Sequence, residues 1–231
     1  RLAAPAADSS RGSLGKGGGQ AAELVLEGQK AALALLVAPI REALRAISAP
    51  EAHGEWGAAA GGGGEGEGEE DEEAATALLA FSATPKAYIT RVGEHLLGMF
   101  LLLEPYAAGA ALSELHADLR APADEEEDAD LEPERANVVA WMGAVATRTK
   151  SLLLAAVEAL PALSAAGAKQ LAADVGYLSN IFAAGLSLPH AELTELEGLL
   201  TCDLAGLPAI AESAVALRPA FAAAVVTKRQ S

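Results

Sequence analysis

Histidine is the residue type in this sequence best suited to hold a metal ion or to transfer a proton near neutral pH. The four histidines stand far apart, and none has a His, Cys, Asp or Glu three or four positions further along: His53, His95, His116 and His190. Without local ligand spacing, a metal site would require the fold to gather side chains from distant segments. We therefore predict no catalytic residue, no cofactor and no metal ion, and we expect a protein that is not an enzyme.

Glycine-rich and acidic runs are the next features that could bind a ligand. The glycines within residues 15–19 and 61–64 lack the Gly-Lys-Ser/Thr ending and the preceding strand of a phosphate-binding loop. Acidic runs at residues 65–73 and 124–134 hold seven and eight carboxylates with no Lys or Arg, but without the spacing of a calcium loop. We interpret these runs as flexible linkers, because like charges repel and glycine leaves the backbone unrestrained.

A polar stripe on one expected helix is the best candidate for a surface that contacts another protein. Gln170, Asp174 and Tyr177 follow one another at steps of four and three, with Asn180 nearby, so they lie near one side of a helix. Such a stripe either contacts a partner or forms hydrogen bonds between neighbouring helices of the same chain, and we favour the second interpretation. Trp141 is ambiguous in the same way, since tryptophan is enriched in cores and in interfaces. These five residues are the candidate partner contacts.

Charge and composition exclude several classes of function. The 231 residues include 32 acids and 16 bases, yet outside the two acidic runs 17 acids face 16 bases. No clustered basic surface is visible, so we expect no nucleic-acid partner. The longest apolar runs are well short of the ~20 residues that cross a bilayer, so any membrane association is expected to be indirect. Cys202 is the single cysteine, which rules out an intrachain disulfide, and the start at Arg1 rather than Met predicts a fragment.

The stretch from residue 134 to 186 organises the chain as two helices with a short connection. Apolar residues three or four positions apart, or at the sum of such steps, mark one face of the first helix: Val138, Trp141, Val145, Leu152, Ala156 and Leu160. Pro161 ends this helix, and Ser164 is the expected N-cap of the next. The apolar face of the second helix carries Leu171, Val175, Leu178 and Phe182. A short connection of this kind favours an antiparallel pair.

Similar periods elsewhere, and the lack of any alternating strand pattern, predict an all-α fold that forms a helical bundle. We expect disordered residues 1–20, a helical segment 21–48, a disordered Gly/acidic insertion 49–75, a helical segment 76–120, an acidic linker 121–134 and a C-terminal helical bundle 135–231. Pro39 should kink or divide the first helix. Thr84 and Pro85 should be the N-cap and first residue of the next, and Pro219 should bend the last.

Two groups of sequence blocks are distinctive in their order. The first comprises Pro85, Tyr88-Ile89-Thr90, Val92-Gly93-Glu94-His95-Leu96-Leu97 and Leu103-Glu104-Pro105. The second comprises Trp141-Met142-Gly143, Leu160-Pro161-Ala162-Leu163-Ser164, Ala168-Lys169-Gln170-Leu171-Ala172-Ala173-Asp174, Tyr177-Leu178 and Asn180. Together these blocks resemble the C-terminal region of the subunit 7 family of the conserved oligomeric Golgi complex. The chain departs from that family at Met99-Phe100, where the family tends to have Leu-Pro, and in its Gly/Glu insertion.

This resemblance implies a helical bundle of the helical-rod type, in a non-enzymatic subunit of a vesicle-tethering complex. It implies a place in the lobe with subunits 5, 6 and 8, contacts with SNAREs, Rab GTPases and coat proteins, and a role in intra-Golgi retrograde transport and so in retention of glycosylation enzymes. It also implies a peripheral location on the cytosolic face of Golgi membranes. The alternative is an unrelated cytosolic helical adaptor or scaffold, since periodicity alone shows only a helical protein.

Overall fold

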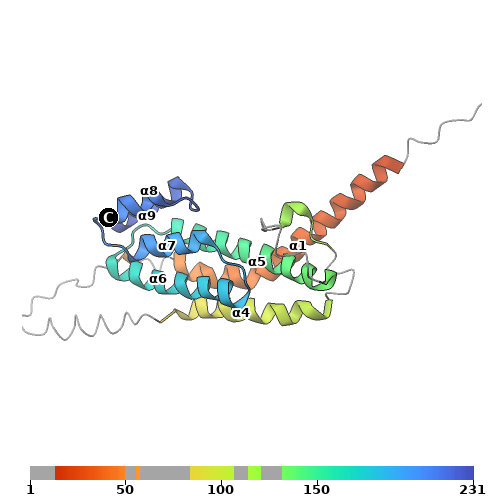
Figure 1. Ribbon diagram of the computed structural model, residues 1–231, viewed down its shortest axis with the longest axis horizontal. Helices are drawn as coiled ribbons and strands as arrows, with labels where there is room; N and C mark the ends of the chain where they lie inside the picture. Colours follow the sequence, from red (N-terminus) through yellow and green to blue (C-terminus); the bar gives the residue numbers. More distant parts are fainter. Residues whose placement is uncertain (1–13, 50–55, 58–83, 107–113, 121–131) are drawn as a thin grey trace, which may run out of the picture.

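A computed structural model describes residues 14–49, 56–57, 84–106, 114–120 and 132–231, and within these ranges every regular element is helical (Figure 1). The all-α prediction is confirmed. The α-helices are α1 (Leu14–Ser48), α4 (Ala87–Leu103), α5 (Pro133–Glu158), α6 (Ala165–Asn180), α7 (Ala191–Thr201), α8 (Leu207–Ser213) and α9 (Pro219–Gln230). Shorter 3₁₀ and π turns are η2 (Glu104–Tyr106), η4 (Ala117–Leu119) and η5 (Ile181–Gly185).

The helices form an elongated bundle in which direction alternates along the chain. Helices α1, α5 and α7 run one way and α4 and α6 run the other, while the N-terminal part of α1 leaves the bundle and α8 and α9 lie at the opposite end (Figure 1). The close backbone pairings are α1 with α5 and α4, and α6 with α7 and α4. Helices α5 and α6 are therefore antiparallel, as expected. They do not pack mainly against each other, however: α5 packs mainly against α1, and α6 packs mainly against α7.

Helix α5 is the central helix, and its core-facing surface is broader than one stripe. Six consecutive residues of α5, 141–146, are buried, and α5 as a whole packs against α1 and also contacts α4 and α9. A helix that is surrounded in this way has no single apolar face to detect in a periodicity analysis. Further along, Leu153 and Val157 are fully buried, whereas the predicted Leu152 and Ala156 are half-buried.

Helix α6 follows the prediction closely. The Ser164 side chain caps its start by accepting a hydrogen bond from the Gly167 N–H at 3.0 Å. Pro161 separates it from α5 as expected. All four predicted core residues of the second helix are buried with no exposed surface: Leu171, Val175, Leu178 and Phe182. Among the helices that the structure describes, none combines the length and apolarity needed to cross a bilayer.

One prediction about the first helix is wrong, and one of the two alternatives for Pro39 is excluded. Helix α1 begins at Leu14, so the glycine-rich residues 15–19 are helical rather than part of a disordered segment that ends at residue 20. Once nucleated, a helix adds residues at low cost in free energy, which composition alone does not reveal. The helix also continues through Pro39 without division. Pro39 is exposed and the Leu35 side chain four residues earlier is 76% exposed, so water can satisfy the Leu35 carbonyl that loses its N–H partner.

Two predictions about other helix ends also need correction. Helix α4 begins at Ala87 with Lys86 as N-cap, rather than at Pro85 with Thr84. The last apolar stretch forms two helices instead of one bent helix, since Arg218 is extended (φ −59°, ψ 133°) immediately before Pro219. A residue that precedes proline is driven away from the helical region by the ring, so α8 ends before this point and Pro219 starts α9.

Trp56 contradicts the prediction that residues 49–75 form a disordered insertion throughout. Its side chain is only 1% exposed, and its indole N–H donates to the Ile47 carbonyl at 2.9 Å. Its own carbonyl accepts from the Ser164 N–H at 2.7 Å, and the Lys86 Nζ lies 4.5 Å from its ring centroid. Trp56 therefore joins the end of α1, the start of α4 and the start of α6, and the remaining residues 50–55 and 58–75 lie outside the described residues.

Candidate protein interface

The polar stripe of α6 is used inside the chain. Asp174 has no exposed surface, and its Oδ1 accepts from the Lys86 backbone N–H at 2.7 Å. Its Oδ2 accepts from the Tyr88 hydroxyl, and Gln170 Nε2 donates to Asp174 Oδ1 at 3.2 Å and to the Thr84 carbonyl at 3.0 Å. A side chain of α6 thus serves the first turn of α4, where an N-terminal amide needs an acceptor. This arrangement fixes the start of α4 against α6.

Burial raises the pKa of the Asp174 carboxyl above its ordinary value, against the hydrogen bonds from Tyr88, Lys86 and Gln170, which lower it. Because the pKa is raised, the folded chain holds this proton more tightly than the unfolded chain does. The free energy of unfolding should therefore decrease as pH rises from the ordinary aspartate range through the folded-state pKa. Asp174 is an internal structural group, held as a buried carboxylate by three donors.

Substitution of Asp174 should separate its hydrogen bonds from its charge. We expect Asp174→Ala to lower the free energy of unfolding by about 2–3 kcal/mol, because it removes the buried acceptor of the Lys86 N–H and the Tyr88 hydroxyl. Asp174→Asn keeps an acceptor oxygen and should cost less than half as much, and it should also remove the Asp174 contribution to the pH dependence. Urea unfolding at several values between pH 4 and pH 7 measures both effects, and equal losses for Ala and Asn would contradict this account.

The remaining candidate partner contacts divide by exposure. Trp141 is 1% exposed, and among the described residues its indole N–H has no hydrogen-bond partner. Tyr177 is half-buried against Gly93 of α4, where a Cβ would come within 2.7 Å of the Tyr177 Oη. Asn180 is exposed at the end of α6. Trp141, like Gln170 and Asp174, is therefore buried within this chain. A partner-contact role stays a prediction for all five residues, of which Tyr177 and Asn180 have more exposed surface.

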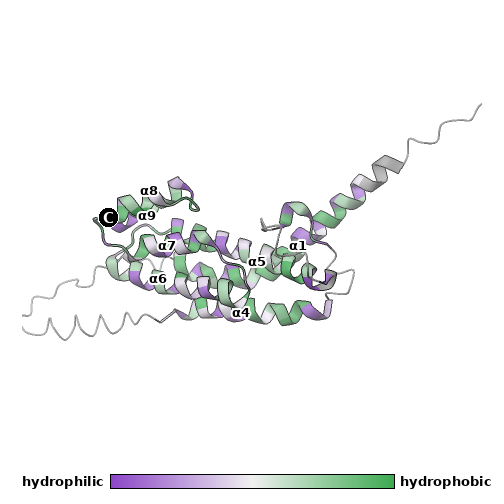
Figure 2. Cartoon of the chain, viewed as in Figure 1, coloured by the Kyte–Doolittle hydropathy of each residue, from purple (hydrophilic) through white to green (hydrophobic). Residues whose placement is uncertain are grey.

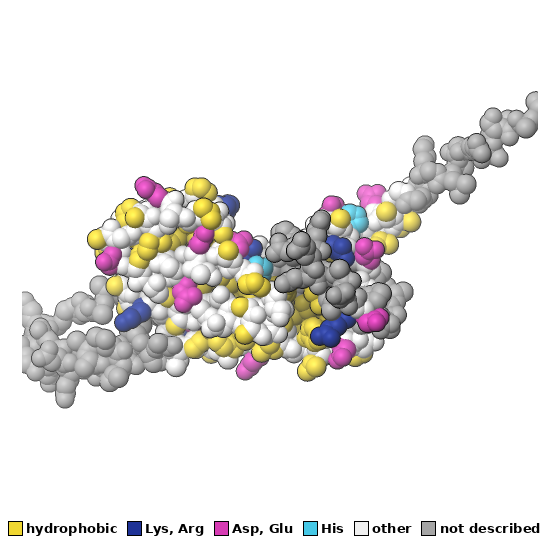
Figure 3. Space-filling model, viewed as in Figure 1, with side chains coloured by type: hydrophobic (Ala, Val, Ile, Leu, Met, Phe, Trp, Pro, Cys, Tyr) yellow, Lys and Arg dark blue, Asp and Glu magenta, His cyan; other side chains and the backbone are white. Residues whose placement is uncertain are grey.

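Helix α4 presents an apolar surface that the sequence analysis did not single out. The surface called the α4 outer face below consists of Leu97, Leu101 and Leu102 of α4 and Tyr106 of the adjoining η2, whose exposed fractions are 42%, 69%, 65% and 58%. Figure 2 shows hydrophobic colouring along α4, and Figure 3 shows hydrophobic side chains along the edge of the molecule where α4 lies. Clustered exposed apolar residues of this kind mark protein-interaction surfaces more often than single ones do.

The α4 outer face adjoins the turn that follows Asn180. The Leu97 Cδ2 lies so close to Gly185 of η5 that a Cβ on this glycine would come within 2.9 Å of it. Gly185 thus permits the close approach of α4 and η5. The apolar face of α4 and the polar end of α6 are consequently neighbours, which gives one surface with an apolar centre and a polar margin.

Glu195 of α7 is an internal functional group that sequence reasoning missed. Its two carboxylate oxygens accept from the backbone N–H groups of Val215, Ala216 and Leu217 at 2.8–3.0 Å. Burial raises the pKa of Glu195, but these amides outweigh it and hold the pKa below its ordinary value. The carboxylate therefore accepts hydrogen bonds from the backbone N–H groups of the segment between α8 and α9, and it holds this segment against α7. The only sequence signal was the proline at 219, which predicts a break without naming its acceptor.

Replacing Glu195 should loosen this break. We expect Glu195→Gln to lower the free energy of unfolding by about 1 kcal/mol, because one acceptor oxygen is lost at a site that solvent partly screens. Since the folded-state pKa is lowered, the wild-type contribution is present above the ordinary glutamate pKa and is lost as pH falls through the folded pKa. Thermal unfolding at pH 7 and pH 3 tests this, with exposed Glu212→Gln on α8 as the control. Equal effects of the two variants at pH 7 would contradict it.

The histidines that the structure describes have structural roles. His95 Nε2 lies 3.0 Å from the Leu36 carbonyl, and the His116 side chain caps η4 by accepting from the Asp118 N–H. His190 packs edge-on against Phe182, with ring centroids 5.0 Å apart. Burial, and to a smaller extent the nearby positive charge of Lys150, lowers the pKa of His190. Within the described ranges no group of three or more His, Cys, Asp or Glu could hold a metal ion. His53 lies outside the described residues.

This architecture defines an all-α helical bundle, with buried polar groups that join its own helices and an apolar helix face that is exposed. The chain belongs to the Golgi complex component 7 (COG7) family, whose family model matches residues 10–230. This membership overturns the alternative of an unrelated helical adaptor, because the match extends over almost the whole chain.

Individual relatives agree with the family match. The chain is 35% identical over 127 residues to the conserved oligomeric Golgi complex subunit 7 of Homo sapiens. The matched region covers 53% of this chain and 16% of the human protein. It is 33% identical over 109 residues to the same subunit of Arabidopsis thaliana, covering 47% of this chain and 11% of the relative. The chain thus spans a small part of the length of these relatives. No solved structure matches it.

Proposed function

We propose that this chain is part of a non-enzymatic subunit of a vesicle-tethering complex that acts in intra-Golgi retrograde transport and so retains glycosylation enzymes in the Golgi. The observation that carries this proposal is the match of residues 10–230 to the Golgi complex component 7 family. The relatives from Homo sapiens and from Arabidopsis thaliana carry the same subunit name. This agreement between an animal and a plant supports the assignment to the complex. The neighbours in the complex would be subunits 5, 6 and 8.

In this proposal the chain works by binding other proteins and performs no chemistry. Buried groups such as Asp174 and Trp56 fix the helices of the bundle to one another. Such a bundle keeps its binding surfaces at fixed relative positions. Weak contacts at several points of such a complex add through effective concentration, which is how a tether holds a vesicle near its target. SNAREs, Rab GTPases and coat proteins are the further partners that we propose, with the protein at the cytosolic face of Golgi membranes.

The α4 outer face is the surface that we assign to a neighbouring subunit. Leu97 and Leu101 lie one helical turn apart and are 42% and 69% exposed, so one partner helix can cover both, with the 65% exposed Leu102 beside them. Burial of an exposed leucine is worth about 1.5–3 kcal/mol, which makes two of them sufficient to dominate a modest interface. The polar end of α6, with Tyr177 and Asn180, would form the margin of this contact.

Co-purification with the complete protein tests the function and the surface separately. Tagged wild-type protein should bring down other subunits of the complex, as identified by mass spectrometry. Leu101→Glu with Leu102→Glu should reduce their recovery several-fold, whereas Leu24→Glu with Leu35→Glu should not, although the α1 leucines are 75% and 76% exposed. Wild-type protein that recovers no other subunit would overturn the function. Full recovery with the α4 variant would overturn only the assignment of the surface.

A further inference from the structure

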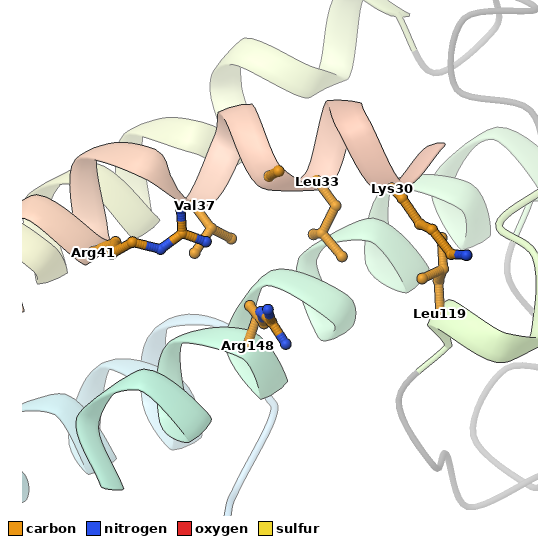
Figure 4. Close-up of a pocket in the computed structure, with 7 residues that line it drawn as sticks. Lys30, Leu33, Val37, Arg41, Leu119 and Arg148 are labelled. Carbon is orange, nitrogen blue, oxygen red and sulfur yellow. The ribbon is translucent and has the colours of Figure 1, made fainter. Parts of the chain in front are cut away.

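A second surface feature lies on a different side of α1 from α4. Helices α1 and α5 pack side by side and leave a groove with a volume of about 360 Å³, closed at one end by η4. Leu33 and Val37 of α1 and Leu119 of η4 form its apolar lining (Figure 4). Helices α1 and α5 run in the same direction beside this groove (Figure 1), so a third helix that lies along them can contact both.

Three cations line this groove, and none of the described residues that line it carries a carboxylate. Lys30 and Arg41 come from α1, and Arg148 lies opposite them on α5 (Figure 4). Lys30 also contacts Glu27 at 2.8 Å, whereas Arg41 and Arg148 have no ion-pair partner among the residues that the structure describes. Lys30 and Arg41 are eleven positions apart, which on a helix is about 16 Å at 1.5 Å per residue. Positive charge therefore extends along about three turns of the groove.

We propose that this groove is a docking site for an acidic amphipathic helix of another protein. Leucine-type side chains of that helix would cover Leu33 and Leu119, which are half-buried, above the fully buried Val37, and its carboxylates would pair with Arg41 and Arg148. Charge complementarity is the reason for choosing an acidic partner. The chain as a whole has a net charge of −16, but the charged side chains among the described residues of this groove are all cations. The proposal is independent of the α4 outer face and does not depend on the tethering function.

The test uses a synthetic helix as the probe. A fluorescent peptide of about 18 residues, long enough to form helix, carries leucines at i, i+4, i+7 and i+11 and glutamates beside them. A control peptide has lysine in place of each glutamate. Fluorescence anisotropy with the complete protein should show binding of the acidic peptide and at least about tenfold weaker binding of the basic one. Affinity for the acidic peptide should fall when salt is raised from about 0.05 M to about 0.3 M.

Matched charge reversals locate the binding. Arg41→Glu with Arg148→Glu should weaken binding of the acidic peptide at least about tenfold. Arg91→Glu with Lys169→Glu makes the same change in net charge at exposed positions of α4 and α6 and should leave binding within about twofold. Circular dichroism establishes that both double variants keep wild-type helix content. Equal loss in the two double variants, or equal binding of the acidic and basic peptides, would overturn the proposal.

Two other occupants are distinguished in the same assay. If phosphatidylserine vesicles bound through Arg41 and Arg148 while the acidic peptide did not, the groove would be a lipid contact and the proposal would be wrong. If replacing the acids of residues 124–134 with glutamine or asparagine strengthened peptide binding more than tenfold, the occupant would be this chain itself. That result would also overturn docking of another protein as the role of the groove. Unchanged affinity after this replacement supports the proposal.

Discussion

Trp56→Ala is expected to lower the free energy of unfolding by about 4 kcal/mol, the usual loss for a buried tryptophan. The indole is 1% exposed and fills the end of the bundle where α1, α4 and α6 meet. Its removal leaves a cavity and takes away the donor to the Ile47 carbonyl and the ring under the Lys86 ammonium group. Guanidinium unfolding followed by circular dichroism measures this change.

Two further variants make the test of Trp56 specific. Trp56→Phe keeps most of the packing but loses the bond from the indole N–H to Ile47, so it should cost about 1–2 kcal/mol. Gly167→Ala should also destabilise the protein, because the new Cβ would lie 2.5 Å from the Trp56 carbonyl oxygen. If Trp56→Ala and Gly167→Ala each changed the unfolding free energy by less than about 1 kcal/mol, Trp56 would not be docked at this junction.

Trp141→Ala should have an effect of similar size, about 3–5 kcal/mol, because Trp141 is 1% exposed and is the first of the six consecutive buried residues of α5. Here the phenylalanine variant should behave differently from that at Trp56. The Trp141 indole N–H has no hydrogen-bond partner among the described residues, so Trp141→Phe loses no such bond and should cost about 1 kcal/mol or less.

The alanine variant, Trp141→Ala, decides between the two interpretations of Trp141, as a core residue or as a partner contact. If Trp141 were a partner contact, Trp141→Ala would leave the unfolding midpoint nearly unchanged and would reduce the recovery of other subunits. If it is a core residue, the midpoint falls and the recovery of subunits follows the folded fraction. Unfolding and co-purification of one variant, measured at a temperature where it remains folded, therefore separate the two roles.

Local signals predicted the helices well where each helix has one buried side. In α4 the apolar residues that recur at steps of three and four in the sequence are all buried: Tyr88, Val92, Leu96, Met99 and Leu103. Pro161 and Ser164 gave the boundary between α5 and α6 because proline and N-cap chemistry act within a few residues. Helix pairing was harder to predict, because the length of a connection constrains neighbours in sequence and not the partners that each face selects.

The missed features depend on contacts between distant parts of the chain. The polar stripe that contains Asp174 was recognised, but its partner at the start of α4 lies 88 positions away and could not be named. Glu195 was missed altogether, because it binds amides about 20 positions further on. Trp56 was assigned to a disordered insertion because its neighbours are rich in glycine and acids, although a large apolar ring gains much from burial. The cations of the groove come from two helices more than 100 residues apart.

The central claim is that this chain acts as part of a Golgi tethering complex whose other subunits determine its position. The most direct measurement follows a tagged copy of the complete protein by microscopy while subunits 5, 6 or 8 are depleted. The account predicts that the tagged protein leaves the Golgi, because its position depends on contacts with its neighbours. A tagged protein that stays at the Golgi at wild-type level after each depletion would contradict the account.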